Sequence, residues 1–381
     1  MTRVLRVLHI ASGDLWAGAE VQAFTLISRL AQMPDTQVAA VLMNEGTLAE
    51  KLRFSGIEVF VLDERKSKSF GILMQLRDVL CRWRPDLVHT HREKENVIGS
   101  LANYTCRSVP SVRTVHGAKE HAAGRGLGGV RHGLVKRLDR WCGGALQQRV
   151  IAVTRDLGTQ LREQFPAEKV VVIENGVDFE AVRREAGRAE FRVAEPDATH
   201  IGIAGRLVAV KRVDIFLETA AALLRGSPQH NWRFHILGDG PMRSNLEGLA
   251  ARLGLGDSVI FSGHQQDIAT CVRGLDAVVI CSDHEGMPMI ALEAAALGVP
   301  TVAHAVGGLV EVVPREFLVT RHDANGYQDA IVRALGEDAR AVAAAHATRT
   351  LGRFSAQRNA ERIRALYEEV VLERYDRREA P

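Results

Sequence analysis

The sequence predicts an α/β protein made of two Rossmann-like domains, each with a parallel sheet covered by helices. Two observations support this prediction. Short apolar runs, which are typical of buried parallel strands, alternate with helical patterns along the chain. The 381 residues are also too many for one ordinary core and suggest two domains. The polar, irregular stretch at 185–200 is the best candidate for the linker between them.

The composition is that of a soluble globular protein and argues against several other classes. Apolar residues make up 46% of the chain and charged residues 25%, which is ordinary for a globular domain. A net charge of +3 is too small to indicate a nucleic-acid partner, and no zinc-finger or RNP motif is present. No window approaches 18 apolar residues, so no membrane span is predicted. Arg6 and His9 interrupt the first apolar run, which therefore reads as a strand and not as a signal peptide.

The five cysteines are scattered along the chain without C-x-x-C spacing. An odd and unpatterned count predicts reduced thiols in the cytosol and no disulfide framework. We therefore expect a cytoplasmic protein.

In the first half of the chain, predicted strands alternate with helices at the spacing of βαβ units. The expected strands lie at 4–10, 38–43, 57–63 and 86–91, and then within 109–117, 149–161 and 169–183. Such alternation predicts a parallel sheet with right-handed crossovers. No G-x-G-x-x-G motif follows the first strand, which counts against a dinucleotide oxidoreductase.

The second half repeats the pattern. Strands are expected within 200–205, 231–255, 258–272, 276–282 and 317–331. An amphipathic helix at 354–375 follows them and ends the regular pattern.

The chain is organised around the stretch at 280–308, where a strand, a polar loop and an apolar helix follow one another. Pro288 suits the first helical turn and Gly298 the helix end, so the helix begins beside the loop. The free N–H groups and positive dipole end of such a helix favour an anion, above all a phosphate. The helix would therefore begin at an anion-binding position.

Two carboxylates frame this position. Glu285 lies in the loop and Glu293 lies eight residues further on, which places them roughly 10 Å apart along a helix. That separation suits a ligand whose hydroxyl-bearing ends flank a diphosphate, because carboxylates accept strong hydrogen bonds from hydroxyl groups. The alternative is a solvated loop acid and an exposed helix acid. The apolar neighbours of Glu293 favour the first interpretation, since a carboxylate among them needs a partner.

The segment EGMPMIALEAAALGVPTVAHAVGG (285–308) resembles the donor-site signature of retaining, GT-B-fold glycosyltransferases of family 4. The resemblance implies two Rossmann-like domains facing each other across a cleft. It places an acceptor domain at 1–183 and a nucleotide-sugar donor domain at 198–353. The C-terminal helix, at 354–381, is expected to cross back to the first domain.

The resemblance also implies roles for particular residues. Arg206 and Lys211 resemble the cations that grip the donor diphosphate and stabilise its developing charge. Glu285 would bind hydroxyls of the donor sugar, Glu293 those of the ribose, and His116 would contact the transferred sugar from the first domain. The other donor-binding residues implied are Gly18, Gly205, Gly240, His264, Gly286, Met287, Pro288, Gly308 and Leu309. Without the resemblance, a lone histidine at a strand end is more often structural.

Two positions depart from the family pattern. Ala17-Gly18 replaces the usual double glycine of the first loop, and Lys211-Arg212 replaces the usual Lys-Gly. The sequence offers no D-x-D motif of metal-dependent sugar transferases. We therefore expect no metal and no cofactor.

The segment at 118–149 is unusually basic and interleaves apolar with basic side chains. The apolar positions are Leu134, Val135, Leu138, Trp141 and Leu146, and the basic positions are Lys136, Arg137 and Arg140. This pattern is typical of a helix that lies on an anionic membrane surface. A core-packing helix with a solvated basic face explains it equally well.

Together these features predict a hexosyltransferase-type enzyme. The expected reaction moves a sugar, with retention, from a nucleoside-diphosphate sugar, most simply UDP-linked, to a hydroxyl of a glycan or lipid-linked acceptor. The expected context is bacterial cell-surface polysaccharide synthesis, on the inner face of the plasma membrane if the basic segment binds there. Two alternatives are a non-hydrolysing sugar-nucleotide epimerase and a non-catalytic sugar-nucleotide-binding partner of a polysaccharide assembly.

Overall fold

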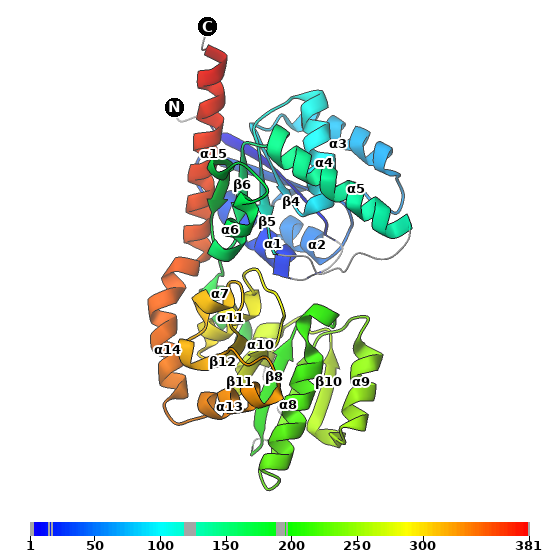
Figure 1. Cartoon of the computed structure of the whole chain (residues 1–381). Coiled ribbons are helices and arrows are strands. Elements are labelled where there is room, and N and C mark those ends of the chain that lie inside the picture. Colours follow the sequence, from blue (N-terminus) through cyan, green and yellow to red (C-terminus); the bar gives the residue numbers. More distant parts are fainter. Residues whose placement is uncertain are drawn as a thin grey trace. The chain divides into compact units, whose positions relative to one another are not determined.

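The chain folds into two compact units, each built on its own parallel sheet (Figure 1). The computed structural model describes residues 4–13, 16, 18–117, 127–187, 195 and 197–379. The first unit comprises Met1–Gly176 and Ala356–Pro381, and the second comprises Val177–Ser355. The C-terminal helix α15 (Ala356–Glu379) packs against α1 (Gly18–Ala31), so it returns to the first unit as the sequence predicts.

The described part of the first unit contains a seven-stranded parallel sheet in the order β3-β2-β1-β4-β5-β6-β7. Its strands are β1 (Leu5–Ala11), β2 (Thr36–Leu42), β3 (Glu58–Val61), β4 (Leu87–His91), β5 (Ser111–Val115), β6 (Arg149–Ala152) and β7 (Val170–Val172). Its other helices are α2 (Thr47–Phe54), α3 (Ser69–Trp83), α4 (Glu93–Cys106), α5 (Leu127–Trp141) and α6 (Arg155–Arg162). The strand order reverses between β1 and β4, where ligands of such sheets commonly bind.

The first sheet is buried on both faces. Along β1, Val7 packs into the core formed with α1 and α15, whereas Leu8 packs into the core formed with α3 and α4. Successive side chains of a strand point to opposite faces, so both faces need apolar residues. This explains why the strands appear in the sequence as continuous apolar runs.

The second unit repeats the architecture with a sheet in the order β10-β9-β8-β11-β12-β13 among the residues described. Its strands are β8 (Thr199–Ala204), β9 (Trp232–Leu237), β10 (Val259–Gly263), β11 (Ala277–Ile280), β12 (Thr301–His304) and β13 (Leu318–Val319). Its helices include α7 (Phe179–Ala186), α8 (Val213–Gly226), α9 (Arg243–Arg252), α10 (Ile268–Arg273), α11 (Met289–Leu297), α12 (Leu309–Val312), α13 (Ala324–Ala334) and α14 (Ala339–Thr350). Here the order reverses between β8 and β11.

The boundary between the units lies just before α7. The contacts of α7 are with α10 and α11, which assigns it to the second unit. The sequence-based boundary after residue 183 would divide this helix. Much of the suggested linker at 185–200 lies outside the described residues.

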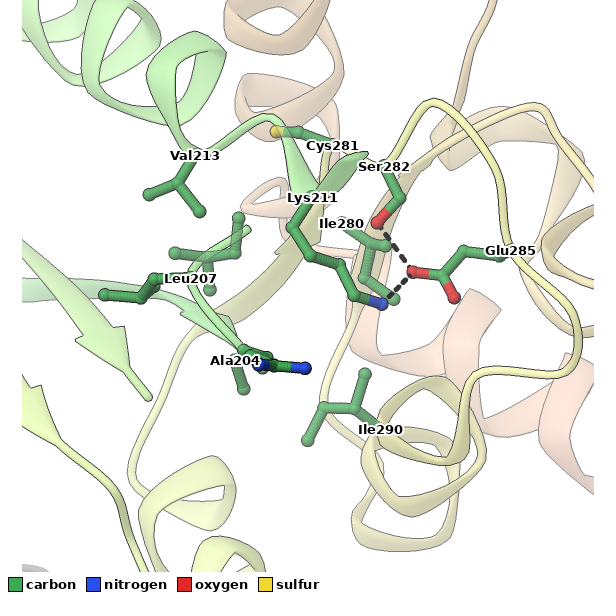
Figure 2. A pocket seen from close by; sticks show the side chains of 12 residues that line it. Ala204, Leu207, Lys211, Val213, Ile280, Cys281, Ser282, Glu285 and Ile290 are labelled. Atoms are coloured by element: carbon green, nitrogen blue, oxygen red, sulfur yellow. Dashed lines mark hydrogen bonds and ion pairs between the residues drawn. The ribbon is translucent and has the colours of Figure 1, made fainter. Parts of the chain in front are cut away.

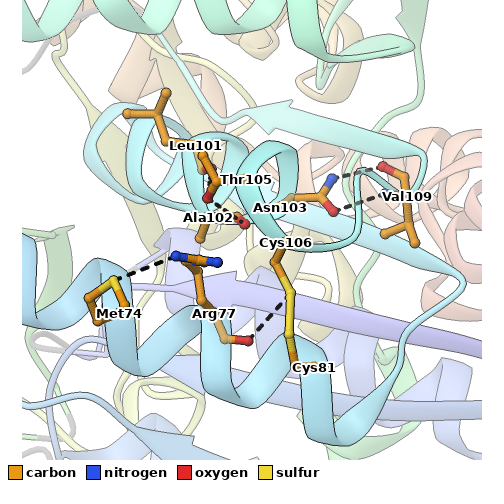
Figure 3. Close-up of a disulfide and its surroundings, with 9 residues drawn as sticks. All are labelled: Met74, Arg77, Cys81, Leu101, Ala102, Asn103, Thr105, Cys106 and Val109. Atoms are coloured by element: carbon orange, nitrogen blue, oxygen red, sulfur yellow. Dashed lines mark hydrogen bonds between the residues drawn. A yellow bond between two sulfur atoms is a disulfide. The ribbon is translucent and has the colours of Figure 1, made fainter.

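The expectation that all cysteines are reduced is wrong for one pair. Cys81 of α3 and Cys106 of α4 form a disulfide, with their Cα atoms 6.9 Å apart (Figure 3). The pairing follows from the packing of α3 against α4, which no spacing motif in the sequence records. The other three cysteines, Cys142, Cys271 and Cys281, are free and buried.

A buried ion pair ties α5 to the first sheet. The Arg113 guanidinium of β5 donates to the Asp139 carboxylate of α5 at 2.7 Å, and the two side chains are 4% and 10% exposed. Asn96 of α4 donates to the same carboxylate at 2.8 Å. The pair therefore fixes which face of α5 is turned toward the sheet.

Breaking this pair is expected to destabilise the first unit strongly. Arg113→Met leaves the Asp139 charge buried without its cation, which typically costs about 3 kcal/mol or more. The measurement is the urea-induced unfolding free energy. Glu45→Gln, which breaks the half-exposed Arg53–Glu45 pair, is the control and should cost no more than about 1 kcal/mol. Equal effects of the two substitutions would contradict the prediction.

Candidate active site

A pocket in the second unit lies at the carboxyl ends of β8 and β11, where the strand order reverses. Its lining residues are Ile203, Ala204, Gly205, Arg206, Leu207, Lys211, Val213, Ile280, Cys281, Ser282, Glu285 and Ile290 (Figure 2). The pocket therefore lies where parallel α/β sheets bind their ligands.

The pocket brings together three residues that the sequence predicts as catalytic, namely Arg206, Lys211 and Glu285. The Lys211 ammonium donates to Glu285 Oε1 at 2.6 Å, and the two side chains are 23% and 10% exposed. Ser282 donates its hydroxyl hydrogen to the same oxygen, also at 2.6 Å. Figure 2 shows these two bonds converging on Glu285. The Glu285 side chain is thus held in place by Lys211 and Ser282 inside the pocket.

Ser282 is a site residue that sequence reasoning missed. It lies just beyond the end of β11, three residues before Glu285. Ser282 and Lys211 both donate to Oε1 of Glu285. The other carboxylate oxygen can therefore accept further hydrogen bonds. The position of Ser282 at the carboxyl end of a predicted strand was the available signal.

Close backbone contacts hold together the loops that follow β8 and β9, beside the pocket. A Cβ atom on Gly238 would lie 1.9 Å from the carbonyl oxygen of Gly205, and one on Gly240 would lie 2.5 Å from that of Leu207. Neither distance is sterically possible for a side-chain carbon. The predicted glycines at 205 and 240 therefore belong to a packed pair of loops at the carboxyl ends of β8 and β9.

The Lys211-Arg212 departure has a structural counterpart. Arg212 adopts the left-handed conformation, with φ 48° and ψ 45°, which costs a side-chain-bearing residue roughly 1–2 kcal/mol and costs glycine little. Its guanidinium pairs with Asp214 at 2.9 Å and with Asp283 at 3.2 Å. These hydrogen bonds raise the pKa of Arg212, despite the opposing effect of burial. They tie the loop that carries Lys211 to the loop that carries Glu285.

A second glycine contact supports the Glu285 loop. Gly307, at φ +52°, lies so close that a Cβ atom would be 1.9 Å from the Glu285 carbonyl oxygen. The Gly308 amide donates to the Gly286 carbonyl at 2.8 Å, and the Leu309 amide donates to another backbone carbonyl at 3.1 Å. These two amides are therefore engaged within the protein, and their predicted contact with a diphosphate would require them to exchange partners.

The remaining predicted residues have varied surroundings. Met287 and Pro288 are buried where α11 begins, and His264 is exposed after β10. Gly18 begins α1 in the first unit. Their predicted ligand contacts remain predictions.

Glu293 is buried in α11 and does not line the pocket described above. Burial, with the nearby Glu185 carboxylate as a smaller cause, raises the pKa of Glu293 to about 7. A carboxyl group in this state is ready to accept hydrogen bonds but is costly to ionise without them. The predicted contact with ribose hydroxyls would supply such bonds.

His116 follows β5 in the first unit and belongs to a group of buried histidines. Its Nε2 lies 3.1 Å from Nδ1 of His91. The ring nitrogens of His9, His89 and His91 lie within 4.8 Å of one another, close enough to share a metal ion. Both nitrogens of His89 are already hydrogen-bonded, to the hydroxyl groups of Tyr367 and Thr114, so a metal would have to displace one of them.

Comparison with known families identifies two matching regions. The profile described as "Glycosyltransferase Family 4" matches residues 16–181, and that described as "Glycosyl transferases group 1" matches residues 198–337. The first match covers most of the first unit and extends into α7, and the second match lies within the second unit.

Individual relatives agree with these matches. The chain is 33% identical over 305 residues to a D-inositol 3-phosphate glycosyltransferase of Saccharomonospora viridis, covering 75% of this chain and 70% of the relative. It is 30% identical over 384 residues to the enzyme of the same name from Actinosynnema mirum, covering 95% and 90%. The fold is that of Anabaena Alr3699/HepE in complex with UDP-glucose, with a TM-score of 0.80, 20% identity, and coverage of 96% and 100%.

The raised pKa of Glu293 predicts a pH-dependent stability. Between about pH 4.5 and pH 7, the folded protein holds a proton that the unfolded chain has released, so wild-type stability falls as the pH rises through this window. Glu293→Gln has no such proton. From pH 4 to pH 8 its unfolding free energy should therefore gain about 3 kcal/mol relative to wild type. Glu337→Gln, at an exposed position of the same unit, is the control. A constant difference between Glu293→Gln and wild type would contradict the raised pKa.

Proposed function

Because the chain belongs to family 4 of the GT-B glycosyltransferases, we propose that it transfers a sugar, with retention, from a UDP-sugar to a hydroxyl group of a glycan or lipid-linked acceptor. The observation that carries this proposal is the convergence of Arg206, Lys211 and Glu285 on one pocket. The comparisons with glycosyltransferases favour transfer over the epimerase and over a non-catalytic binding partner.

The chemistry of the pocket suits a leaving nucleoside diphosphate. Negative charge grows on the departing phosphate as the glycosidic bond breaks, and preorganised cations stabilise that charge. Lys211 and Arg206 supply cations at the carboxyl edge of the sheet. When the diphosphate takes over Lys211, Glu285 keeps its bond from Ser282 and can accept hydrogen bonds from sugar hydroxyls.

Different comparisons bear on the identity of the nucleotide and on the identity of the acceptor. UDP is supported by the Anabaena structures of the same fold, which contain UDP or UDP-glucose. The curated relatives are named for D-inositol 3-phosphate, which makes a phosphorylated cyclitol a second candidate acceptor beside glycans and lipid-linked sugars. An assay with each acceptor class, read by NMR of the new anomeric proton, decides both the acceptor and retention.

Lys211→Ala should lower kcat by about two to three orders of magnitude, the range observed when one electrostatic contact to a transition state is removed. The measurement is the turnover of UDP-sugars together with the rise in Tm on adding UDP, since a ligand of the folded state raises Tm. Arg340→Ala removes a positive charge from the same unit outside the pocket and should leave both unchanged. Turnover near the wild-type level in Lys211→Ala would remove this residue from the mechanism.

We further propose that α5 docks the protein on the inner leaflet of the plasma membrane, where lipid-linked acceptors lie. Leu134, Leu138 and Trp141 are 60%, 37% and 49% exposed, and their spacing places them along one face of the helix. Arg137 and Arg140 are exposed beside them. An apolar stripe flanked by arginines fits an anionic bilayer surface. Residues 118–126 of the basic segment lie outside the described residues, and so do the side chains of 127–132.

No described helix is both long and apolar enough to cross a membrane. Peripheral docking would therefore depend on the exposed stripe and on the basic side chains. Its electrostatic part is expected to weaken at high salt, because salt screens exposed charges.

Leu134→Ser with Trp141→Ala should lower the affinity for anionic vesicles at least about tenfold, because these side chains would lose roughly 1.5–3 kcal/mol each of apolar burial. Vesicle flotation at low and high salt measures the effect. Phe54→Ser is the control, since Phe54 of α2 is 95% exposed elsewhere on the first unit. Wild-type protein that fails to float with anionic vesicles even at low salt would defeat the docking proposal.

A further inference from the structure

Three histidines of the first unit form a continuous hydrogen-bonded chain. Nδ1 of His9, on β1, lies 3.2 Å from Nε2 of His91, on β4. Nδ1 of His91 lies 3.1 Å from Nε2 of His116, which follows β5. The rings are stacked at 5.6 Å and 5.4 Å between centroids, with 21° between planes in both pairs. His9 on β1, His91 at the end of β4 and His116 just after β5 thus form one line of imidazoles.

His89 lies beside this chain but is bonded elsewhere. Its Nδ1 lies 2.5 Å from the hydroxyl of Tyr367, on α15, and its Nε2 lies 2.8 Å from the hydroxyl of Thr114. Both of its hydrogen-bonding groups are therefore satisfied. Tyr367 and His89 form a separate buried pair that serves as an internal comparison for the chain.

Burial keeps the three hydrogen-bonded histidines neutral. Burial is the largest cause that lowers the pKa of each member, to about 4 for His91 and well below the ordinary value for His9 and His116. The Arg92 guanidinium lowers the pKa of His91 and His116 further. Glu20 holds that guanidinium at 2.7 Å. The positive charge beside the chain is therefore fixed in place.

Neutrality couples the tautomers of the three rings. Each neutral imidazole has one N–H group, so all the N–H bonds in the chain must point in the same direction. At the two ends, Nε2 of His9 and Nδ1 of His116 are buried without a hydrogen-bond partner among the described residues. A buried polar atom without a partner calls for an explanation, and a catalytic role is one. A hydrogen bond from a ligand to His116 would set the tautomer of His91 as well.

We propose that His91 is a positioning residue, which holds His116 in one orientation and one neutral tautomer for contact with the transferred sugar. This inference rests on the proposed function and on the role that the family resemblance implies for His116, which is contact with the transferred sugar. Sugar transfer builds positive charge at the anomeric carbon, so an imidazolium facing it would raise the barrier, whereas a neutral ring would not. An oriented partner on the far nitrogen is how proteins commonly fix a histidine tautomer.

The first test needs no substrate. Protein with ¹⁵N-labelled histidine rings is titrated by NMR, and the signals are assigned with single His→Gln variants. We expect His91 and His116 to remain neutral from pH 6 to pH 8, each with one protonated nitrogen. Protonation of either ring on both nitrogens at pH 7 would overturn the inference, whatever the enzyme transfers.

The second test separates positioning from folding. His91→Leu should lower kcat about tenfold to a hundredfold with KM for the donor unchanged, the range typical for losing the partner that orients a functional histidine. His91→Gln, whose amide can donate or accept, should recover most of the loss. Tyr367→Phe keeps the ring that packs against His9 and removes only the hydroxyl bonded to His89, which takes no part in the hydrogen bonds between the three histidines, so kcat and the His116 signals should be unchanged.

These measurements distinguish the inference from the function on which it rests. Absence of sugar transfer with every donor and acceptor would defeat the proposed function, while the titration would still report on the chain. A wild-type kcat in folded His91→Leu would contradict the positioning role of His91 and leave the proposed function standing. So would a loss of kcat in Tyr367→Phe as large as that in His91→Leu.

Discussion

Both units of this protein bury a parallel sheet on both faces, and this constraint decides where chemistry can occur. Helices cover the faces, so most side chains within the strands are apolar, and the polar groups of the pocket lie where the strands end. In the second unit, Lys211, Ser282 and Glu285 meet at such an edge. In the first unit, His91 and His116 follow the same rule, since one ends β4 and the other follows β5.

Close backbone packing then holds the loops that carry the functional groups. At Gly238 and Gly307 the neighbouring carbonyl oxygens leave no space for a side chain. Arg212 differs from these glycines, because a residue with a side chain occupies a left-handed backbone position there. Its bonds to Asp214 and Asp283 offset part of the conformational cost and join the two loops of the pocket. Arg212 thus adds an electrostatic link between the two loops.

Buried polar groups have different roles in the two units. In the Arg113–Asp139 pair each charge is balanced by the other, and the pair sets the orientation of α5. No cation among the described residues pairs with Glu293, and its pKa is raised to about 7 by burial and by Glu185. The His9–His91–His116 chain avoids charge altogether. The two ends of the histidine chain, which we connect with function, retain unused hydrogen-bonding capacity among the described residues.

The sequence by itself predicted the strands, the two units and the family, and it singled out Arg206, Lys211 and Glu285, which line one pocket. Periodicity and local motifs allow this because they depend on neighbouring residues along the chain. The tertiary structure alone decided the Cys81–Cys106 disulfide, the bond from Ser282 and the chain of histidines. It also decided which face of α5 is exposed. Those features depend on how separate elements pack against one another, and packing joins residues whose spacing along the chain carries no pattern.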